Sequence, residues 1–273
     1  MARILAITNQ KGGVGKTTTT INLAASLVAM KRRVLVVDMD PQANATTGSG
    51  IDKHELHDTI NDVLLGNVAA ANIIVTTDPA GYDVLPANSD LTAAQVMLIN
   101  DENREVKLKQ ALAAINDNYD YIVIDCPPTL SLLTLNALVA ADAVFIPMQC
   151  EFYALEGASD LLNTIHRVQE TVNPNLDIEG VVRTMYDPRS RLTKDVSAEL
   201  TKHFGDKLYR SVIPRNIRLA EAPSYGTAVL HYDKRSVGAN AYLALAGEMI
   251  RREDSSRVDK NSHESADSST SDD

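Results

Sequence analysis

A glycine-rich segment near the N-terminus combines two lysines with a pair of threonines. Residues 9–18 read NQKGGVGKTT. Glycine allows the backbone to curl so that successive N–H groups point at the oxygens of one phosphate group. Lys16 would then reach the outer phosphates of a nucleotide, and the hydroxyl of Thr17 would bind Mg²⁺. The predicted nucleotide contacts are Gly12, Gly13, Val14, Gly15, Lys16, Thr17 and Thr18.

The context of this segment favours a phosphate-binding loop over a chance cluster of glycines and lysines. An apolar run precedes the segment and a helical pattern follows it, which is the setting that such a loop requires. The positive dipole end of the helix would add to the attraction for phosphate. Two positions depart from the usual pattern, because Gln10 replaces a glycine and Lys11 adds a second cation.

Acidic side chains end two other apolar runs. The run YIVID ends at Asp125, and the run VLVVD ends at Asp38, with Asp40 two residues later. In a doubly wound sheet such strand ends face the ligand crevice. Asp125 is predicted to hold the Mg²⁺ shell through water. Asp38 and Asp40 should point to the same side. One would support the metal or the loop and the other would position a water molecule, unless the strand simply ends in solvent.

Apolar runs rich in Ile and Val alternate with helical patterns along the chain. Such near-continuous runs are typical of strands in a parallel sheet that is covered on both faces. This alternation predicts an α/β fold with a doubly wound, mostly parallel twisted sheet and helices on both faces. The predicted strands are Arg3–Thr8, Arg33–Asp38, Tyr121–Cys126, Ala143–Met148, Ile178–Met185 and Leu208–Ile213. The predicted helices are Thr17–Met30, Ser89–Ile99, Glu102–Ala114, Leu132–Ala140, Leu155–Val172, Thr193–His203 and Val237–Arg252.

Length and composition predict one domain followed by a tail. The chain has 273 residues, a formal net charge of −10 and two cysteines, Cys126 and Cys150, both in apolar runs. These cysteines argue against a disulfide scaffold and favour a reducing compartment. No segment offers the roughly 18 uninterrupted apolar residues that a membrane span needs. Residues 1–252 are predicted to form a single domain, and the acidic, serine-rich residues 253–273 to form a disordered tail.

Basic residues gather in the last third of the chain despite the negative net charge. No recognition-helix or zinc-finger pattern accompanies them, so base-specific readout is not expected. They either contact nucleic-acid phosphates or form a solvated basic face, and the residues alone leave both interpretations open. The cluster consists of Arg183, Arg189, Arg191, Lys194, Arg210, Arg215, Arg218, Lys234 and Arg235.

Six segments, taken together, resemble the ParA/Soj family of chromosome-partitioning ATPases. They read KGGVGKTTTT, VLVVDMDPQAN, YDYIVIDCPP, MQCEFYALEG, RTMYDPRSRL and IPRNIRLAEAPSYG, and they span nearly all of residues 1–250 in order. The family has a deviant P-loop NTPase fold, whose loop carries an extra lysine and tolerates a residue other than glycine at position 10. The resemblance implies ATPase activity with ATP and Mg²⁺ as cofactors.

The resemblance also implies roles for single residues. It implies an ATP-bound homodimer in which Lys11 reaches the phosphates of the partner. Asp40 would orient or deprotonate the attacking water, with Asp38 as its supporting acid and Asp125 in the metal shell. Two ammonium groups in one small loop repel each other unless anions neutralise them. This repulsion is consistent with a second lysine that binds phosphate. The residues that match the adenine-proximal region of the family are Met185, Pro214, Arg215 and Asn216.

The resemblance further implies a DNA partner. Arg189 and Arg218 match the family positions that bind double-stranded DNA without sequence preference, and Arg191, Arg215 and Lys234 are weaker candidates. The family also implies a ParB-like centromere-binding partner protein, a cytoplasmic and nucleoid-associated location, and no contact with a membrane.

Other functions on the same fold are the alternatives. A MinD-like cell-division positioning protein would need a basic amphipathic helix at its C-terminus, where this chain is acidic and rich in serine. A small-molecule ATP-dependent ligase would lack the partition-type segments at residues 183–226. A nitrogenase-type iron protein would need paired cluster cysteines, and the positions of Cys126 and Cys150 do not match them.

Overall fold

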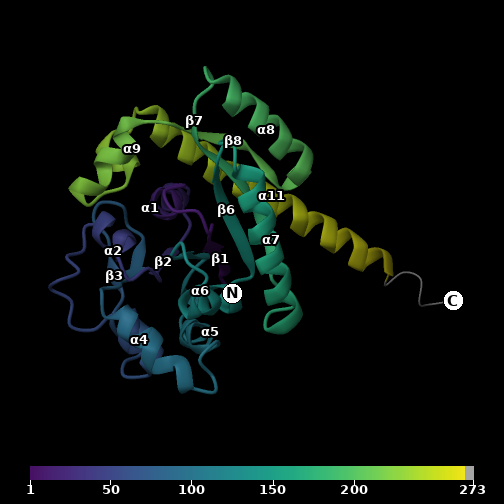
Figure 1. Cartoon of the computed structure of the whole chain (residues 1–273). Helices are drawn as coiled ribbons and strands as arrows, with labels where there is room; N and C mark the ends of the chain where they lie inside the picture. The colour runs from purple at the N-terminus through teal and green to yellow at the C-terminus, as the bar shows by residue number, and fades with distance from the viewer. Residues whose placement is uncertain (268–273) are drawn as a thin grey trace.

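One eight-stranded sheet forms the centre of the molecule (Figure 1). The structure is a computed structural model that describes residues 1–267, with side chains described as far as Ser255. The strands are β1 (Arg3–Ile7), β2 (Val34–Asp38), β3 (Val75–Thr76), β4 (Asp83–Leu85), β5 (Tyr121–Asp125), β6 (Ala143–Gln149), β7 (Asp177–Tyr186) and β8 (Leu208–Pro214). Their order in the sheet is β3-β4-β2-β5-β1-β6-β7-β8, and only β3 runs antiparallel to its neighbour among the described strands.

Helices cover both faces of the sheet, so the predicted doubly wound, mostly parallel α/β fold is confirmed (Figure 1). Consecutive strand residues point to opposite faces. Ile4 and Ala6 of β1 therefore pack in the core that includes α3 to α7, whereas Leu5 and Ile7 pack in the core that includes α1 and α11. The α-helices are α1 (Lys16–Ala29), α2 (Asn44–Gly48), α3 (Ile60–Leu65), α4 (Leu91–Met97), α5 (Lys107–Ala113), α6 (Leu132–Ala140), α7 (Ala154–Thr171), α8 (Arg191–Phe204), α9 (Ile217–Glu221), α10 (Val229–Tyr232) and α11 (Val237–Asp267).

Several boundaries differ from the sequence prediction for local reasons. The short strands β3 and β4 were not predicted, because two or three residues carry no periodicity that a pattern can reveal. The helix predicted from Glu102 begins only at Lys107. Asp101 accepts a hydrogen bond from the N–H of Asn103 at 2.8 Å, a turn that competes with helix formation.

Helix α11 continues beyond the predicted end of the domain. The sequence predicted a helix that ends at Arg252, whereas α11 extends to Asp267 in the structure. Extending an existing helix is much easier than starting one, and this stretch contains no proline or glycine to stop it. Residues 268–273 of the predicted tail lie outside the described residues, and the domain limits stay a prediction.

The connections that follow the adjacent parallel strands β1 and β6 lead to opposite sides of the sheet. β1 leads through α1 to β2 on one side of the sheet, and β6 leads through α7 to β7 on the other. In doubly wound sheets, ligands bind outside the carboxyl ends of the strands at such a switch point. The loops that follow β1 and β6 are therefore the expected borders of a ligand site.

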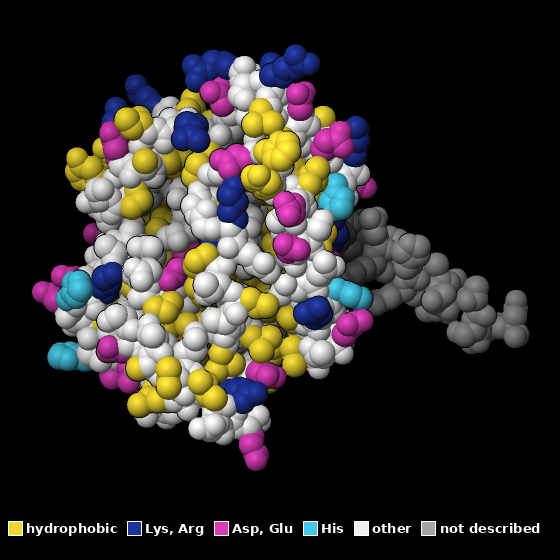
Figure 2. Space-filling model, in the orientation of Figure 1, with side chains coloured by type: hydrophobic (Ala, Val, Ile, Leu, Met, Phe, Trp, Pro, Cys, Tyr) yellow, Lys and Arg dark blue, Asp and Glu magenta, His cyan; other side chains and the backbone are white. Residues whose placement is uncertain are grey.

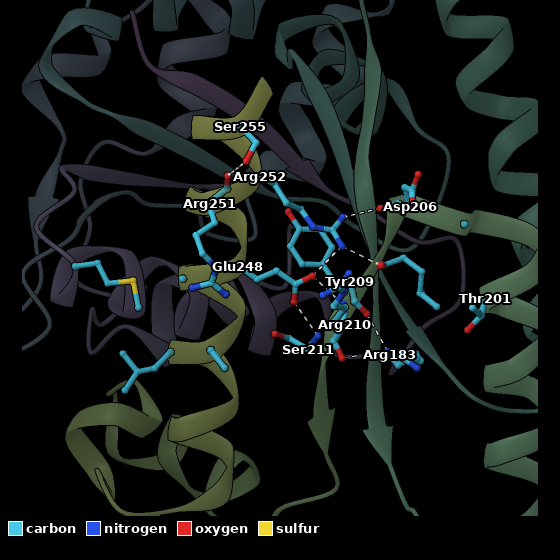
Figure 3. Close-up of a pocket in the computed structure, with 16 residues that line it drawn as sticks. Arg183, Thr201, Asp206, Tyr209, Arg210, Ser211, Glu248, Arg251, Arg252 and Ser255 are labelled. Carbon is cyan, nitrogen blue, oxygen red and sulfur yellow. Dashed lines mark hydrogen bonds and ion pairs between the residues drawn. The ribbon is translucent and has the colours of Figure 1, made fainter. Parts of the chain in front are cut away.

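A bulge in the edge strand β8 is held by an arginine of β7 (Figure 3). Three residues of β8, 209–211, face a single residue of β7. The guanidinium of Arg183 donates to the main-chain oxygens of Tyr209 at 2.9 Å and Arg210 at 3.2 Å, and to the hydroxyl of Ser197 at 2.9 Å. Arg183, which the sequence grouped with the basic cluster, therefore supports the sheet.

Glu248 joins helix α11 to the same bulge (Figure 3). Its carboxylate accepts the N–H groups of Arg210 and Ser211 at 2.8 Å each, and the guanidinium of Arg252 at 2.7 Å. Arg252 also donates to the main-chain oxygen of Asp206 at 2.8 Å. These groups line a hollow of about 1180 Å³. Their polar atoms make hydrogen bonds with main-chain groups of the edge strand β8 and hold α11 against it.

We expect Glu248→Ala to lower the free energy of unfolding by about 2–4 kcal/mol, because it leaves two main-chain N–H groups without their acceptor and removes one of the acceptors of Arg252. Urea denaturation measures the change. The matched control is Glu199→Ala, which removes an exposed ion pair with Lys202 and should cost less than about 1 kcal/mol. Equal losses in the two variants would show that Glu248 does not hold the edge strand.

Candidate nucleotide-binding site

The glycine-rich loop joins the carboxyl end of β1 to the first turn of α1. Gly13 and Gly15 have φ angles of 75° and 89°, in the left-handed region that favours glycine. Gly15 directly precedes Lys16, the first residue of α1. This helix has no side-chain cap and no acidic residue in its first turn. Its first N–H groups are therefore available to an anion such as a phosphate.

Two neighbouring strands fasten this loop. The hydroxyl of Thr184 on β7 donates to the main-chain oxygen of Val14 at 2.7 Å. The amide of Gln149, the last residue of β6, donates to the main-chain oxygen of Gly13 at 3.0 Å. Both bonds use carbonyl groups, so they fix the loop without occupying the N–H groups that would bind phosphate.

Lys16 is a buried cation at the end of this loop. Only 7% of its surface is exposed, and its Nζ lies 3.2 Å from the main-chain oxygen of Lys11. Burial lowers the pKa of Lys16, while the nearby carboxylate of Asp125 opposes that shift. A buried ammonium gains strongly from a charged acceptor. A phosphate oxygen would supply that acceptor.

Two buried carboxylates end adjacent strands beside the loop. The register places Asp125 of β5 opposite Asp38 of β2. The hydroxyls of Thr17 and Thr20 donate to Asp125 at 2.7 and 3.0 Å and so tie the start of α1 to β5. Burial raises the pKa of Asp125, and the charge of Asp38 raises it further. The charge of one carboxylate thus opposes ionisation of the other, and a bound cation would relieve that cost.

Asp38 and Asp40 lie next to each other but differ in their partners. Asp38 accepts both the N–H and the hydroxyl of Thr46 at 2.8 Å, and its other oxygen accepts the N–H of Asp40 at 3.1 Å. Asp38 thus holds the segment that follows β2, and its contact with a metal stays a prediction. Asp40 is half-buried and accepts the N–H of Gln42 at 2.9 Å. Its carboxylate is accessible to a water molecule.

The hydroxyl of Thr17 and the carboxylate of Asp125 are donors of the kind that Mg²⁺ takes. Within residues 1–267, no group of three or more His, Cys, Asp or Glu side chains is placed to hold a metal ion. Mg²⁺ usually keeps several waters and takes one or two carboxylates together with substrate phosphates. The hydroxyl of Thr17 and the carboxylate of Asp125 supply that small set of donors.

The second lysine of the loop makes an ion pair that the sequence did not predict. Lys11 bonds through its Nζ to the carboxylate of Glu151, which lies in the turn between β6 and α7. Both side chains are exposed. The signal was present in the segment MQCEFYALEG, but only the fold shows that β6 ends beside β1. The ammonium of Lys11 is therefore held on the exposed rim of the site, by the turn that follows β6.

Comparison with known proteins decides the family. A family model described as an AAA domain matches residues 2–178. The sporulation initiation inhibitor protein Soj of Bacillus subtilis is 53% identical over 249 residues, which is 91% of this chain and 98% of that protein. The chromosome partitioning protein ParA of Caulobacter vibrioides is 52% identical over 253 residues, which is 92% of this chain and 95% of that protein. The chain belongs to the ParA/Soj family.

A solved structure agrees with this assignment. Cobyrinic acid a,c-diamide synthase from Mycobacterium smegmatis, with a bound ATP analogue and magnesium, matches with a TM-score of 0.83 at 39% identity. The match covers 94% of this chain and 97% of that one. The P-loop fold that the sequence predicted is therefore confirmed. The chromosome-partitioning ATPase Soj of Treponema pallidum is 45% identical over 253 residues, and as a member of this family the protein is an ATPase.

The residues predicted near the adenine come together in the structure. Pro214 at the end of β8 pairs with Tyr186, and the N–H of Arg215 donates to the main-chain oxygen of Tyr186 at 3.3 Å. Met185 precedes Tyr186 and has a φ of 48°, an uncommon angle for a residue other than glycine. The side-chain oxygen of Asn216 is buried without a protein partner among the described residues. The arrangement suits a polar ligand edge, but contact with adenine stays a prediction.

The residues that the ParA/Soj resemblance matched to DNA contacts are exposed and paired with acids. Lys and Arg side chains gather at the top of the view in Figure 2, over α8 and α9. Arg189 makes two hydrogen bonds of 2.9 Å with Asp187 and holds the pKa of that carboxyl at about 2. Arg218 pairs with Glu221 at 2.8 Å and with Asp233 at 3.3 Å. Arg191, Arg215 and Lys234 are exposed as well.

The described helices carry no membrane span. None of those within residues 1–267 combines the length and the apolar content that crossing a bilayer would take.

We expect Asp125→Asn to change both the pH dependence of stability without ligands and the stabilisation by Mg²⁺ and nucleotide. The raised pKa of Asp125 means that the folded protein without ligands holds a proton there more tightly than the unfolded chain does. Stability without ligands should therefore fall as the pH rises from about 4, the ordinary pKa of an aspartate, to about 8, its pKa in the folded protein, and the Asp125→Asn variant should lose a few kcal/mol less over that range.

The same variant should gain less stability from Mg²⁺ and ADP than the unmodified protein. Urea unfolding with and without both ligands measures the two effects, and Asp117→Asn, on the exposed surface, is the control. Equal stabilisation of the Asp125 variant by Mg²⁺ and ADP would contradict the metal assignment.

Proposed function

We propose that this protein uses ATP binding and hydrolysis to position replicated DNA. It is an ATPase with ATP and Mg²⁺ as cofactors. The observation that carries the proposal is that two lysines of one loop lie in different environments. Lys16 is buried beside Asp125, whereas Lys11 lies on the exposed rim. A phosphate site in a single chain needs the buried lysine, and the exposed one is available to a second copy.

The nucleotide binds across the carboxyl edge of the sheet. The loop from Gly12 to Gly15 and the first turn of α1 donate N–H groups to the phosphates, and Lys16 neutralises their outer oxygens. The hydroxyl of Thr17 and the carboxylate of Asp125 would hold Mg²⁺, which would supply positive charge to neutralise the phosphates. Asp40 orients the attacking water and accepts its proton, while Asp38 fixes the segment that carries Asp40 through its bond to that residue's N–H.

Dimer formation depends on the γ-phosphate. In the isolated chain, Lys11 is paired with Glu151. When two ATP-bound copies face each other, each Lys11 leaves that pair and binds the phosphates of the partner, as an arginine finger does in related reactions. The lysine then both stabilises the dimer and spreads the charge that develops during hydrolysis. Loss of the γ-phosphate removes its acceptor and separates the copies.

The dimer binds DNA without reading its sequence. Arg189 and Arg218 are the principal phosphate contacts, and Arg191, Arg215 and Lys234 extend the surface. Pairing with Asp187, Glu221 and Asp233 weakens the attraction of one copy for DNA. Two copies double the number of phosphate contacts, which raises affinity steeply. Binding therefore follows the nucleotide state.

A second protein completes the cycle. A ParB-like centromere-binding protein stimulates hydrolysis, after which ADP-bound monomers leave the DNA. The protein is accordingly placed in the cytoplasm and on the nucleoid. The relatives that support this proposal are the Soj and ParA proteins, at 53% and 52% identity.

A small-molecule ligase is the second candidate, because the Mycobacterium smegmatis neighbour is named a diamide synthase. Its identity of 39% is lower than that of the Soj and ParA relatives. Stimulation of ATP turnover by DNA and a centromere-bound protein distinguishes a partition ATPase from a ligase, whose turnover requires its acid substrate.

We expect Asp40→Ala to bind ATP normally but to hydrolyse it at least about 100-fold more slowly, because it removes the group that activates water. With ATP and Mg²⁺ it should elute as a dimer and stay on DNA. Size-exclusion chromatography with light scattering, with and without DNA, measures both. Asp90→Ala, in an exposed turn, serves as the control and should behave like the unmodified protein. Rapid hydrolysis by the Asp40 variant would assign water activation to another residue.

We expect Arg218→Glu to abolish DNA retention while leaving basal ATP hydrolysis intact. A smaller change, Arg218→Ala, should lower the log–log slope of DNA affinity against salt by about 2 per dimer, since two phosphate contacts disappear. Glu221→Gln should have the opposite effect and raise DNA affinity, because it frees Arg218 from one acidic partner.

The control for these variants is Arg33→Glu. Arg33 is an exposed arginine with one acidic partner, Asp120, at the start of β2 and away from the proposed surface. Equal loss of DNA in the Arg33 and Arg218 variants would mean that net charge alone, rather than this surface, governs binding.

A further inference from the structure

Two adjacent aromatic residues protrude from the turn between β6 and α7. Phe152 is 75% exposed and Tyr153 is 65% exposed. Their rings contact each other edge to face, with centroids 5.1 Å apart. Burying an aromatic side chain removes a large apolar area from water, which is favourable. An exposed aromatic pair is therefore a frequent sign of an interface.

This aromatic pair belongs to the rim of the nucleotide site. Glu151, the residue before Phe152, holds Lys11 of the glycine-rich loop. The loop is also tied to helix α7, since the amide of Gln10 donates to the hydroxyl of Thr164 at 2.9 Å. The aromatic pair and the glycine-rich loop thus belong to one surface, which we call the rim patch. It consists of Lys11, Glu151, Phe152, Tyr153 and Glu156.

The outer side of the loop leaves room for a partner. Gly12 and Gly13 are exposed, and a Cβ added to either would meet no described atom within 4 Å. A second chain could therefore approach the phosphates across these glycines without displacing side chains of this one.

The charges of the rim patch suit a second copy of this chain rather than DNA. On the face shown in Figure 2, apolar side chains lie among acidic and basic ones over the start of α7. Glu151 and Glu156 are exposed beside the aromatic pair, and Lys11 is the cation of the patch. The carboxylates repel DNA phosphates. A copy related by a two-fold axis brings its own Lys11 and its own carboxylates, so the patch is complementary to itself.

We propose that Phe152 and Tyr153 are the apolar anchor of the interface between two ATP-bound copies of this chain. The inference rests on the proposed ATP-dependent dimer and names the surface that forms it. In the isolated chain, Glu151 keeps Lys11 against its own turn. The γ-phosphate of the facing copy competes for Lys11, and the same approach covers the aromatic pair that follows Glu151. Anchor residues of this kind carry most of the binding energy of an interface.

The first test compares two double variants in the presence of a non-hydrolysable ATP analogue and Mg²⁺. Phe152→Ala/Tyr153→Ala removes the anchor, and Val96→Ala/Met97→Ala removes an equally exposed apolar pair from α4, where the two residues are 63% and 67% exposed. The dissociation constant of the dimer is measured by analytical ultracentrifugation. The affinity of dilute monomer for a fluorescent ATP analogue is measured in parallel.

We expect the Phe152/Tyr153 variant to need at least a tenfold higher concentration to dimerise, with unchanged nucleotide affinity and melting temperature. The Val96/Met97 variant should dimerise like the unmodified protein. Unchanged dimerisation of the Phe152/Tyr153 variant would overturn the inference and leave the proposed function standing. An unmodified protein that stays monomeric with the analogue would overturn both.

The second test uses the absence of tryptophan from the sequence. Tyr153→Trp places a single fluorescent reporter in the rim patch, and Met97→Trp places one on α4 as the control. Emission of the Tyr153→Trp variant should shift to shorter wavelength with the ATP analogue, at the protein concentrations where the dimer forms, and should not shift with ADP. A shift that is independent of protein concentration would mean that nucleotide binding within one chain moves the turn, which contradicts burial between two copies.

Discussion

Two buried carboxylates at the ends of adjacent strands determine how the site is built. Asp125 fixes the start of α1 through the hydroxyls of Thr17 and Thr20, and Asp38 fixes the segment after β2 through Thr46. Both groups are fully buried and face each other in register. The charge of Asp38 raises the pKa of Asp125, and the buried ammonium of Lys16 lies near Asp125. The fold therefore holds charge ready for a metal and for phosphates, at some cost to its own stability.

The topology gives the second lysine a different setting. Because β1 lies next to β6, the loop after β1 meets the turn after β6, and Lys11 reaches Glu151 there. The same turn carries Phe152 and Tyr153. Cation, anion and apolar surface thus stand together at the border of the nucleotide site. A phosphate at this border can change both the pairing of Lys11 and the surface that a second copy contacts, which couples nucleotide state to assembly.

The sequence predicted much of this arrangement, and the parts that it missed have clear physical causes. The six predicted strands form because continuous Ile- and Val-rich runs suit a doubly covered sheet, and Asp125 lies at a strand end as expected. Contacts between residues distant in sequence, such as Lys11 with Glu151, were not predictable, because local sequence patterns do not give the order of the strands in the sheet. Arg183 was grouped with surface cations, although it satisfies a bulge that only the β7–β8 register reveals. The length of α11 depends on helix propagation, which composition alone described poorly.

In the proposed cycle, Lys16 binds phosphate within its own chain while Lys11 binds the phosphates of the partner. The most direct measurement is a crystal structure with a non-hydrolysable ATP analogue and Mg²⁺. We expect two chains facing each other, with each Lys11 released from Glu151 and bonded to the terminal phosphate held by its partner. A nucleotide-loaded monomer in which Lys11 still pairs with Glu151, at protein concentrations that favour assembly, would contradict it.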